Sequence, residues 1–520
     1  MMPENKVLVL DFGSQYTQLI TRVIREQSVY SIQLPWHTPR DQIIDLQPGG
    51  IILSGGPASI YLNNAPKFPE YLLELQVPIL GICYGMQALA DELGGKVTPA
   101  SNREYGYTQI DIAEDNILLP RGKHQVWMSH GDLIESIPTG FNILGSTENA
   151  PVAAIGDTDR MYFGLQFHPE VKHTSIGTEI ISNFLFRICK LRPDWTPNSI
   201  ITQNINEIRD LVGNERVIAG VSGGVDSTVS ATLVLKAIGN QLDAVFVDTG
   251  LLRKNEKTQV IEALGKSLKM QLHIVDGADD FYKDLSGITD PEQKRILIGN
   301  RFIRLFEKKA QELGTPKFLV QGTIYPDVVE SAAPDRENAE VIKTHHNVGG
   351  LPSDMELSLI EPLRFLFKDE VRRIGEALGL PRELVWRQPF PGPGLAIRCL
   401  GEVKKDRIKL LQNADEIFLD ELAALNLLQA PADNLNAGSS QAFAVLLPVK
   451  SVGVMGDKRT YQNVIALRSV STTDFMTADW TRLPMELLAK VSSRIVNEIP
   501  GINRVVYDIT SKPPGTIEWE

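Results

Sequence analysis

The sequence has few cysteines, and they are not paired. Cys83, Cys189 and Cys399 are the only three in 520 residues, and no CxxC motif occurs. An odd set of widely spaced cysteines indicates neither a disulfide framework nor a zinc site. The adjacent histidines of IKTHHN (342–347) would point in opposite directions on a strand, so they do not suggest zinc either. We therefore expect no zinc and no disulfide framework.

Long apolar runs and excess positive charge are also missing. The first segment, MMPENKVLVLDFG, has one lysine and an apolar stretch interrupted by Asp11, which is unlike a signal peptide. No run approaches the roughly 20 apolar residues that cross a bilayer. The 52 basic residues are outnumbered by 64 acidic ones, for a net charge of −12, which argues against general affinity for nucleic acid. We expect a cytoplasmic protein that binds small molecules, and neither nucleic acid nor membranes.

The length and two proline-rich segments indicate about three domains. At roughly 100–200 residues per domain, 520 residues suggest that number. RPDWTPN (192–198) is typical of a linker, and PFPGPGL (389–395) cannot form regular structure. Apolar segments alternate with helix-like ones in both of the regions before and after the linker, as in α/β folds. The sequence predicts two parallel-sheet α/β domains and a small α/β domain, with the boundaries 5–195, 196–395 and 396–520.

The segment GICYG (81–85) places Cys83 between two glycines at the end of an apolar run. Helix-like spacing follows it, so the context is the strand, turn and helix of a nucleophile elbow. Ligands of parallel sheets bind at the carboxyl ends of strands, and a helix N-terminus favours a thiolate. A lone cysteine is often just a small buried hydrophobic residue, and Cys83 by itself leaves that alternative open.

The segment MYFGLQFHPE (161–170) supplies partners for a nucleophilic cysteine. A thiol with an ordinary pKa of about 8.5 is mostly protonated at pH 7 and needs a base. The strand period of two points His168 and Glu170 to one face. The imidazole can then act as the base while the carboxylate fixes its tautomer.

A second candidate site lies at SGGVDS (222–227), between an apolar strand and an amphipathic helix. Glycines there let the backbone approach a phosphate, and hydroxyls and helix N–H groups can bind it. The loop lacks the lysine of a Walker A motif. A Gly-Ser turn before a helix could be only a cap, but all six residues at such a junction favour a phosphate site.

Both sites resemble known families. GICYGMQ and FHPE, with LSGGP (53–57) and MSHGD (128–132), resemble class I glutamine amidotransferases. That resemblance implies glutamine hydrolysis through a Cys83 thioester, with Gly56 and Tyr84 as backbone oxyanion donors and Gln87 as a further residue of the glutamine site. SGGVDS resembles the loop of the Rossmann-like N-type ATP pyrophosphatases, which implies Mg²⁺ on Asp226. The implied ATP-binding residues are Ser222, Gly223, Gly224, Val225, Asp226, Ser227, Thr228 and Asp248.

Ammonia together with adenylyl activation implies replacement of a carbonyl oxygen by an amino group. Deamido-NAD, aspartate, a pyrimidine nucleotide or xanthosine monophosphate (XMP) could be the acceptor. QGTIYPDVVES (321–331), IKTHHNVGGLP (342–352), PFPGPGL and the tail SKPPGTIEWE (511–520) are similar to glutamine-hydrolysing GMP synthetases over essentially the whole chain. The resemblance implies XMP as acceptor and a homodimer formed through the last domain. It also implies XMP-binding residues Arg295, Gln441, Lys512 and Glu518 and lid residues Asp327, Glu330 and Lys343. PDRENAE (334–340) is more acidic than expected of the family.

Two other functions remain possible from the sequence. A glutamine-dependent NAD synthetase shares the ATP chemistry, although such enzymes usually carry a nitrilase-type amidase. A glutamine or nucleotide sensor without turnover would be expected to lack catalytic residues, whereas Cys83, His168, Glu170, Ser222 and Asp226 are all present.

Overall fold

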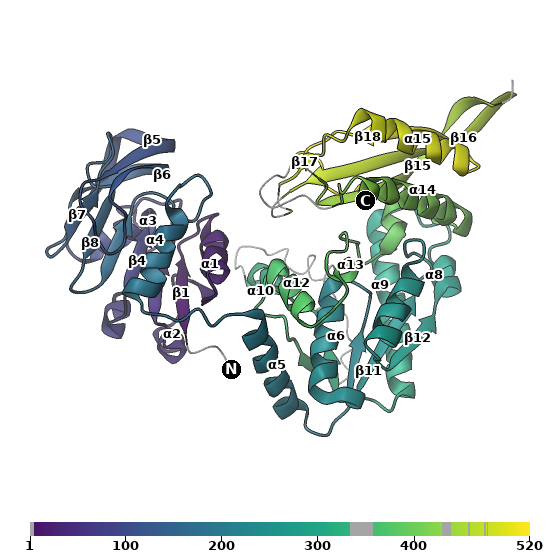
Figure 1. The fold of residues 1–520 in the computed structure, drawn as a ribbon, viewed down its shortest axis with the longest axis horizontal. Coiled ribbons are helices and arrows are strands. Elements are labelled where there is room, and N and C mark those ends of the chain that lie inside the picture. Colours follow the sequence, from purple (N-terminus) through teal and green to yellow (C-terminus); the bar gives the residue numbers. More distant parts are fainter. Residues whose placement is uncertain (1–4, 333–356, 429–437, 456–457, 473–474, 476) are drawn as a thin grey trace. The chain divides into compact units, whose positions relative to one another are not determined.

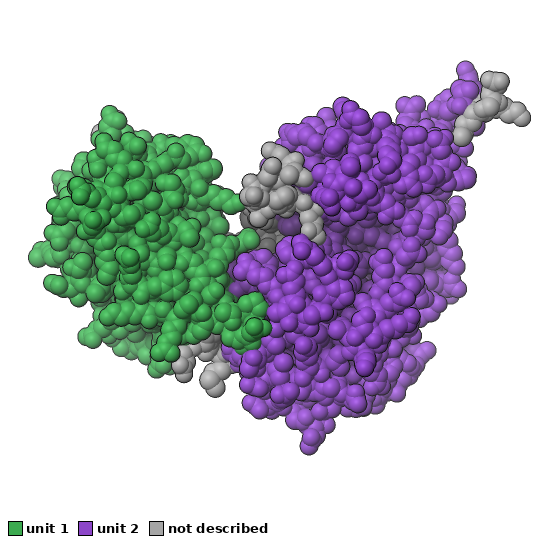
Figure 2. Space-filling view, in the orientation of Figure 1, with its two compact units in different colours: residues 1–200 green, residues 201–520 purple. Residues whose placement is uncertain are grey.

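The computed structural model describes residues 5–332, 357–428, 438–455, 458–472, 475 and 477–520. The chain divides into two compact units, residues 1–200 and 201–520, which Figure 2 colours separately. Figure 1 shows the ribbon of each unit, with many of its helices and strands labelled. Among the residues described, no helix is long and apolar enough to cross a membrane.

Unit 1 is built on a seven-stranded sheet in the order β2-β1-β3-β4-β9-β8-β7. Its five parallel strands are β1 (Lys6–Asp11), β2 (Tyr30–Pro35), β3 (Gly50–Leu53), β4 (Ile79–Ile82) and β9 (Tyr162–Leu165). The antiparallel edge is β8 (Ala154–Asp157) and β7 (Asn142–Gly145). Every residue of β3, β4 and β9 is buried, as expected where both faces of a parallel sheet are covered.

Two hydrophobic clusters lie on the two faces of this sheet. Val7 and Val9 belong to one cluster and Leu8 and Leu10 to the other, as the strand period of two requires. The helical segments are α1 (Thr17–Glu26), α2 (Arg40–Leu46), η1 (Glu70–Leu75), α3 (Tyr84–Glu92), α4 (Gly177–Ser182) and η2 (Asn183–Ile188). A separate antiparallel ribbon is formed by β5 (Lys96–Ile112) and β6 (Gly122–Ser136).

The first part of unit 2 is a five-stranded parallel sheet in the order β12-β11-β10-β13-β14. Its strands are β10 (Val217–Gly220), β11 (Leu242–Asp248), β12 (Leu272–Asp276), β13 (Phe318–Val320) and β14 (Ser358–Ile360). The helical segments are α5 (Pro197–Val212), α6 (Val225–Ile238), η3 (Gly239–Gln241), α7 (Glu256–Val260), η4 (Ile261–Ser267), α8 (Ala278–Asp284), α9 (Pro291–Glu312), α10 (Tyr325–Ala332), α12 (Lys368–Ala377) and α13 (Arg382–Val385). The predicted α/β class with two parallel sheets is confirmed.

The last part of unit 2 combines a mixed sheet with two long helices. The strands are β15 (Gln441–Met455), β16 (Lys458–Ser471), β17 (Asp479–Trp480) and β18 (Ile502–Asp508). The helical segments are η6 (Gly394–Arg398), α14 (Lys405–Ala424) and α15 (Met485–Glu498). β15 and β16 pair antiparallel, whereas β18 runs parallel to β16. This is the small α/β domain that the sequence predicts.

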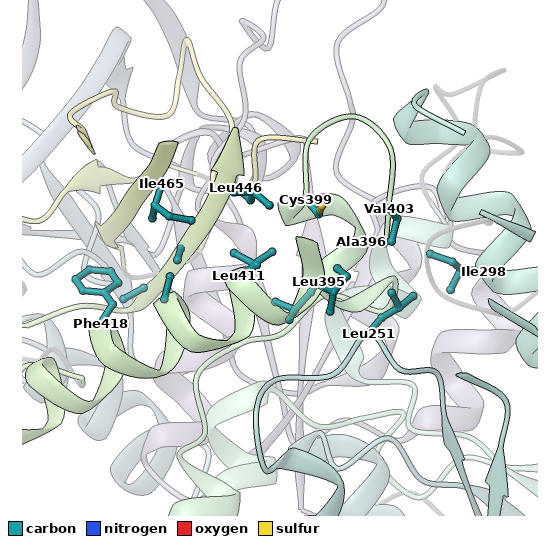
Figure 3. Close-up of a cluster of buried hydrophobic side chains, with 14 of the residues drawn as sticks. Leu251, Ile298, Leu395, Ala396, Cys399, Val403, Leu411, Phe418, Leu446 and Ile465 are labelled. Atoms are coloured by element: carbon teal, nitrogen blue, oxygen red, sulfur yellow. The ribbon is translucent and has the colours of Figure 1, made fainter. Parts of the chain in front are cut away.

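One hydrophobic cluster joins these two parts of unit 2. Figure 3 shows Leu251 and Ile298 of the parallel-sheet part in the same cluster as Leu411 and Leu446 of the last part. Leu395 and Ala396, on either side of the predicted boundary, are both fully buried. The domain boundaries 5–195, 196–395 and 396–520 stay a prediction.

Candidate active sites

The first site is a sharp turn between β4 and α3. Cys83 has φ 52° and ψ −107°, a conformation that is strained for any residue other than glycine. A Cβ on Gly81 would lie 2.6 Å from backbone atoms of Gly85, and a Cβ on Gly85 would collide with the backbone of Leu53. The two glycines are therefore needed to bring strand and helix this close around the sulfur.

Cys83 is held at the turn and is 6% exposed. Its N–H donates to the Leu165 carbonyl at the end of β9 (2.7 Å), and its Sγ lies 3.5 Å from the Ser129 carbonyl on β6. His168 and Glu170 follow β9, and both are buried. His168 Nδ1 lies 2.7 Å from Glu170 Oε1. The structure thus brings together the three residues that the sequence predicts for nucleophilic catalysis.

The electrostatics of this group favour a charged imidazole. Burial lowers the pKa of His168, but the Glu170 carboxylate and the contact with Cys83 raise it more, to about 10. His168 is then protonated at neutral pH. The sequence predicts His168 as a base, and the raised pKa places a proton on this imidazole, where a leaving group can take it.

The other predicted residues of this site lie around the elbow. Tyr84 is the first residue of α3, so its backbone N–H has no acceptor within the helix. A Cβ on Gly56 would lie 2.9 Å from the Phe12 carbonyl and 3.2 Å from the Tyr84 ring, so only glycine allows this approach. Gln87 is buried one turn along α3. Its amide N–H groups face the Asp132 carbonyl (3.3 Å) and Gln166 Oε1 (3.2 Å).

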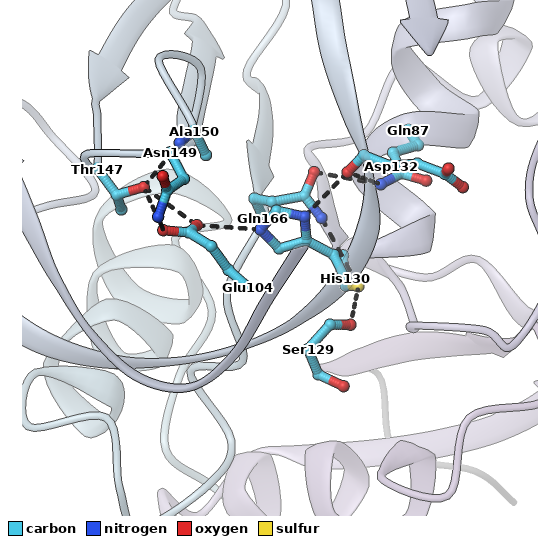
Figure 4. A network of polar contacts seen from close by, with 10 residues as sticks. Gln87, Glu104, Ser129, His130, Asp132, Thr147, Asn149, Ala150 and Gln166 are labelled. Atoms are coloured by element: carbon cyan, nitrogen blue, oxygen red, sulfur yellow. Dashed lines mark hydrogen bonds and ion pairs between the residues drawn. The ribbon is translucent and has the colours of Figure 1, made fainter. Parts of the chain in front are cut away.

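A buried polar network extends from this point to the ribbon, as Figure 4 shows. His130 Nδ1 lies 3.0 Å from the same Asp132 carbonyl, and His130 Nε2 lies 3.2 Å from Glu104 Oε2. Thr147 donates to both oxygens of Glu104, at 3.1 Å each. The MSHGD segment, which supported the amidotransferase resemblance, therefore connects the elbow to β5.

The second site is the loop between β10 and α6. Gly223 has φ +78°, and a Cβ there would collide with Val260. Ser222 Oγ lies 3.2 Å from Ser227 Oγ and accepts from the Gly224 N–H at 3.3 Å. Thr228 is buried in the first turn of α6. The loop is compact and presents a helix N-terminus, as a phosphate site requires.

Asp226 is the one acidic residue in the first turn of α6. Its Oδ2 forms an ion pair with Lys368 of α12, while Oδ1 is buried without a hydrogen-bond partner. A buried carboxylate oxygen of this kind fits Mg²⁺, which commonly takes one or two carboxylates and completes its shell with phosphates and water. In the described part of the chain, no group of three or more His, Cys, Asp and Glu residues is placed to hold a metal.

Asp248, at the end of β11, borders a cavity of about 330 Å³. Its Oδ2 pairs with Lys257 Nζ at 2.7 Å, and its Oδ1 accepts from the Gly250 N–H at 2.9 Å. Arg253, Lys254 and Lys409 also line the cavity. The surroundings of Asp248 are therefore cationic and suit a polyanionic ligand such as a nucleotide.

Two of the four predicted XMP residues are in direct contact. Gln441 Nε2 donates to Glu518 Oε1 at 2.8 Å, and Glu518 accepts two hydrogen bonds from the Arg398 guanidinium, at 3.0 and 2.7 Å. Arg295 donates to the backbone carbonyl of Glu520 (2.7 Å), and Lys512 to that of Phe475 (2.6 Å). Arg295, which belongs to α9, thus contacts the end of the tail, whereas Lys512 lies at the start of the tail.

Two buried cations anchor the tail, and sequence reasoning missed both. Arg398 and Lys294 are completely buried. Lys294 Nζ lies 2.5 Å from Glu520 Oε2, and Arg398 holds Glu518 with its guanidinium 4.0 Å from the centre of the Phe443 ring. A buried lysine or arginine needs such a partner, but no local motif marks it. Sequence reasoning also missed two cations at the SGGVDS loop. Lys368 pairs with Asp226, and Arg387 donates to the Gly223 carbonyl at 3.1 Å.

The predicted lid falls mostly outside what can be described. Asp327 lies in the first turn of α10 and accepts from the Ile324 N–H at 3.0 Å. Glu330 lies in the same helix, but its side chain is outside the described residues, as is all of Lys343.

Comparisons with known proteins cover both units. The glutamine amidotransferase class-I family matches residues 8–188, the NAD synthase family residues 199–308, and the GMP synthase C terminal domain residues 429–519. The NAD synthase match is confined to the ATP-handling segment, so an NAD synthetase is not favoured.

Relatives called GMP synthase (glutamine-hydrolyzing) match essentially the whole chain. That of Thermomicrobium roseum is 54% identical and the alignment covers 99% of this chain and 97% of the relative. That of Carboxydothermus hydrogenoformans is 53% identical, covering 99% and 100%, and that of Syntrophomonas wolfei is 54% identical, covering 100% of each. The chain therefore belongs to the glutamine-hydrolysing GMP synthase family.

Proposed function

We propose that Cys83 attacks the side-chain amide of glutamine in unit 1 and releases its nitrogen as ammonia. The sulfur adds to the amide carbon, and the negative charge on oxygen is received by the backbone N–H groups of Gly56 and Tyr84. The carbon–nitrogen bond then breaks, and ammonia leaves with the proton of His168. The product is a thioester between Cys83 and the glutamyl group.

Water completes the cycle with the same residues. His168, now neutral, takes a proton from water as the oxygen attacks the thioester carbon. The carbon–sulfur bond breaks, glutamate leaves, and the pair of thiolate and imidazolium is restored. Glu170 holds the imidazole in one orientation throughout, which the 2.7 Å contact supports.

The acceptor reaction takes place in unit 2. Ser222, Ser227, Thr228 and the backbone of the loop bind the β and γ phosphates of ATP. The oxygen on C2 of XMP attacks the α-phosphate, and pyrophosphate leaves. Ammonia then attacks C2, the bond to AMP breaks, and GMP forms with loss of a proton. A Mg²⁺ ion bound by Asp226 would neutralise charge on the phosphates, and the buried free oxygen of Asp226 supports this assignment.

XMP is assigned to the tail and β15, through Arg295, Gln441, Lys512 and Glu518. Gln441 and Glu518 are hydrogen-bonded to each other, which supports the proposal that these two residues belong to one binding surface. Asp248 and its cationic cavity are assigned to ATP. Asp327, Glu330 and Lys343 are proposed as lid residues from the family resemblance.

The observation that carries the proposal is the buried group of Cys83, His168 and Glu170 at the elbow, in a chain of this family. The test is a substrate panel. With glutamine and Mg-ATP, we expect pyrophosphate release with XMP and none with deamido-NAD. Release with deamido-NAD alone would assign the chain to NAD synthesis. Absence of release with either acceptor, from folded protein that binds ATP, would support a sensor.

We also propose a cytoplasmic homodimer formed through the last α/β part. Val452 and Tyr461 are cross-strand partners on β15 and β16, and both are exposed, as are Val449 and Val454 nearby. Exposed apolar residues clustered on a strand pair are typical of an interface. One chain has a mass of 57.6 kDa, and light scattering should give twice this value. A monomer at micromolar concentration would contradict the dimer.

A further inference from the structure

Gln166 is a buried residue beside the nucleophile that the reaction as described does not use. It follows β9 directly and is completely buried. Its side-chain Nε2 lies 3.7 Å from the Sγ of Cys83, within hydrogen-bond distance for sulfur. Gln166 precedes His168 by two residues, so both point to the same face of the strand end.

The network in Figure 4 determines which atom of the Gln166 amide faces the sulfur. The Asp132 backbone carbonyl can only accept, so the Gln87 group that faces it at 3.3 Å must be NH₂. The same NH₂ group donates its other hydrogen to Gln166 at 3.2 Å, so that atom of Gln166 must be the oxygen. The remaining atom of the Gln166 amide, an N–H donor, therefore faces Cys83.

The sulfur lies between a donor and an acceptor that favour opposite charge states. The Ser129 carbonyl, 3.5 Å from Sγ, accepts only from a thiol S–H. The Gln166 N–H bonds more strongly to a negatively charged sulfur. At a site that is 6% exposed, little water is present to solvate a thiolate, so a fixed donor is effective there.

We propose that Gln166 is a catalytic residue that donates a hydrogen bond to the Cys83 thiolate and keeps the sulfur ionised. Gln87 is a positioning residue that orients the Gln166 amide, in addition to its predicted place in the glutamine site. The inference rests on the proposed role of Cys83 as nucleophile. It adds a second stabilising contact to that of His168.

The test is the pH dependence of Cys83 alkylation in the full chain. Iodoacetamide is applied between pH 5 and 10, and the modified Cys83 peptide is quantified by mass spectrometry. We compare Gln166→Leu, which removes the amide without adding charge, with Gln166→Glu, which keeps the oxygen that Gln87 needs, removes the N–H and adds a negative charge beside the sulfur. Gln125→Leu is the matched control, because Gln125 is an exposed glutamine of unit 1 whose amide bonds to the His173 carbonyl.

In Gln166→Leu we expect the midpoint of alkylation to move up by about one pH unit, and in Gln166→Glu by at least as much, because its carboxylate also repels the thiolate. The plateau rate at high pH should stay equal or rise by about threefold, because a more basic thiolate is a better nucleophile. Glutaminase turnover at pH 7 should fall by about 10- to 100-fold, as expected for loss of a hydrogen bond to a charged group. Gln166→Leu leaves the titratable groups around the network, His168 with Glu170 and His130 with Glu104, unchanged, whereas Gln166→Glu adds its own carboxyl.

Three results separate the outcomes. An unchanged midpoint in both Gln166 variants, with Cys83 still required for glutaminase, would overturn the inference alone. A lower plateau together with an unchanged midpoint would indicate a merely structural role and would also overturn it. Glutaminase activity in Cys83→Ala would instead overturn the proposed function. Thermal unfolding of Gln166→Glu, an isosteric change, checks that loss of activity does not come from loss of the fold.

Discussion

The two proposed catalytic centres differ in how they are assembled. The proposed amidase centre in unit 1 is buried, and its cysteine, imidazole and carboxylate come from two turns at neighbouring strand ends. The proposed centre in unit 2 takes its loop from β10 and α6, its lysine from α12, and the residues proposed to bind the nucleotide from α9, β15 and the tail. The first is complete within one compact fold, whereas the second depends on contacts between segments up to 226 residues apart.

This difference has a consequence for variants. A change in the amidase centre should remove one chemical step and leave the fold and the other centre intact. A change among the long-range contacts of unit 2 should affect binding and stability together.

The largest effect is expected from Cys83→Ala. Glutamine-dependent GMP formation should fall by at least about 10⁴-fold, because no other group supplies the nucleophile. Synthesis from a concentrated ammonium salt at mildly alkaline pH should continue near the wild-type rate. GMP formation is measured with each donor side by side. Loss of the ammonia reaction in a folded variant would mean that the two centres are not separable.

Asp226→Asn should reduce pyrophosphate release by about 10²- to 10³-fold with either nitrogen donor, because it weakens charge stabilisation at the phosphates. Glutaminase activity should remain. Asp284→Asn is the matched control. Asp284 lies in α8, and its Oδ2 pairs with Arg301 Nε at a distance of 2.6 Å. Wild-type release by Asp226→Asn at saturating Mg²⁺ would remove this residue from metal binding.

Glu518→Gln should affect both XMP binding and the stability of unit 2. It leaves the fully buried Arg398 without its carboxylate, which typically costs about 3–5 kcal/mol. Denaturant unfolding and an XMP titration measure the two effects. Glu498→Gln, on an exposed pair with Arg494, should change stability by less than about 1 kcal/mol. Equal stability of the two variants would contradict the anchoring role of Arg398.

The smallest effect expected is a pH shift in Glu170→Gln. His168 has a raised pKa of about 10, so its ion pair contributes stability that is complete below about pH 6.5 and is lost as the pH rises through about 10. Without the Glu170 carboxylate this pKa falls, and the loss should begin at lower pH. Unfolding free energies between pH 6 and 10 test this. Superimposable alkaline profiles would argue against Glu170 as the main source of the shift.

Sequence reasoning predicts local geometry well where it depends on near neighbours in the chain, whereas the chemical roles of these residues stay predictions. The glycines around Cys83, the His-x-Glu spacing and the SGGVDS loop each define a local backbone geometry, so a single segment predicts them. Gln166 could also have been found, because it shares the strand period with His168.

The residues that were missed depend on tertiary burial. Nothing near Arg398 or Lys294 in the chain indicates that each is completely buried, or that a glutamate of the tail, more than 100 residues away, neutralises it. Likewise, the pairing of Glu104 with His130 follows from the register of the ribbon β5–β6. Register and burial are properties of the packed fold, and one sequence does not display them as a motif.

The conformation of Cys83 sets catalysis against stability in this protein. A left-handed φ of 52° with ψ −107° costs about 1–3 kcal/mol for a residue with a side chain, whereas glycine tolerates it. Selection for stability alone would therefore favour glycine at position 83, which would remove the proposed nucleophile. The cysteine persists because the surrounding sheet provides enough stability to hold it there. Unit 1 should consequently tolerate fewer destabilising substitutions in its core than its extensive packing suggests.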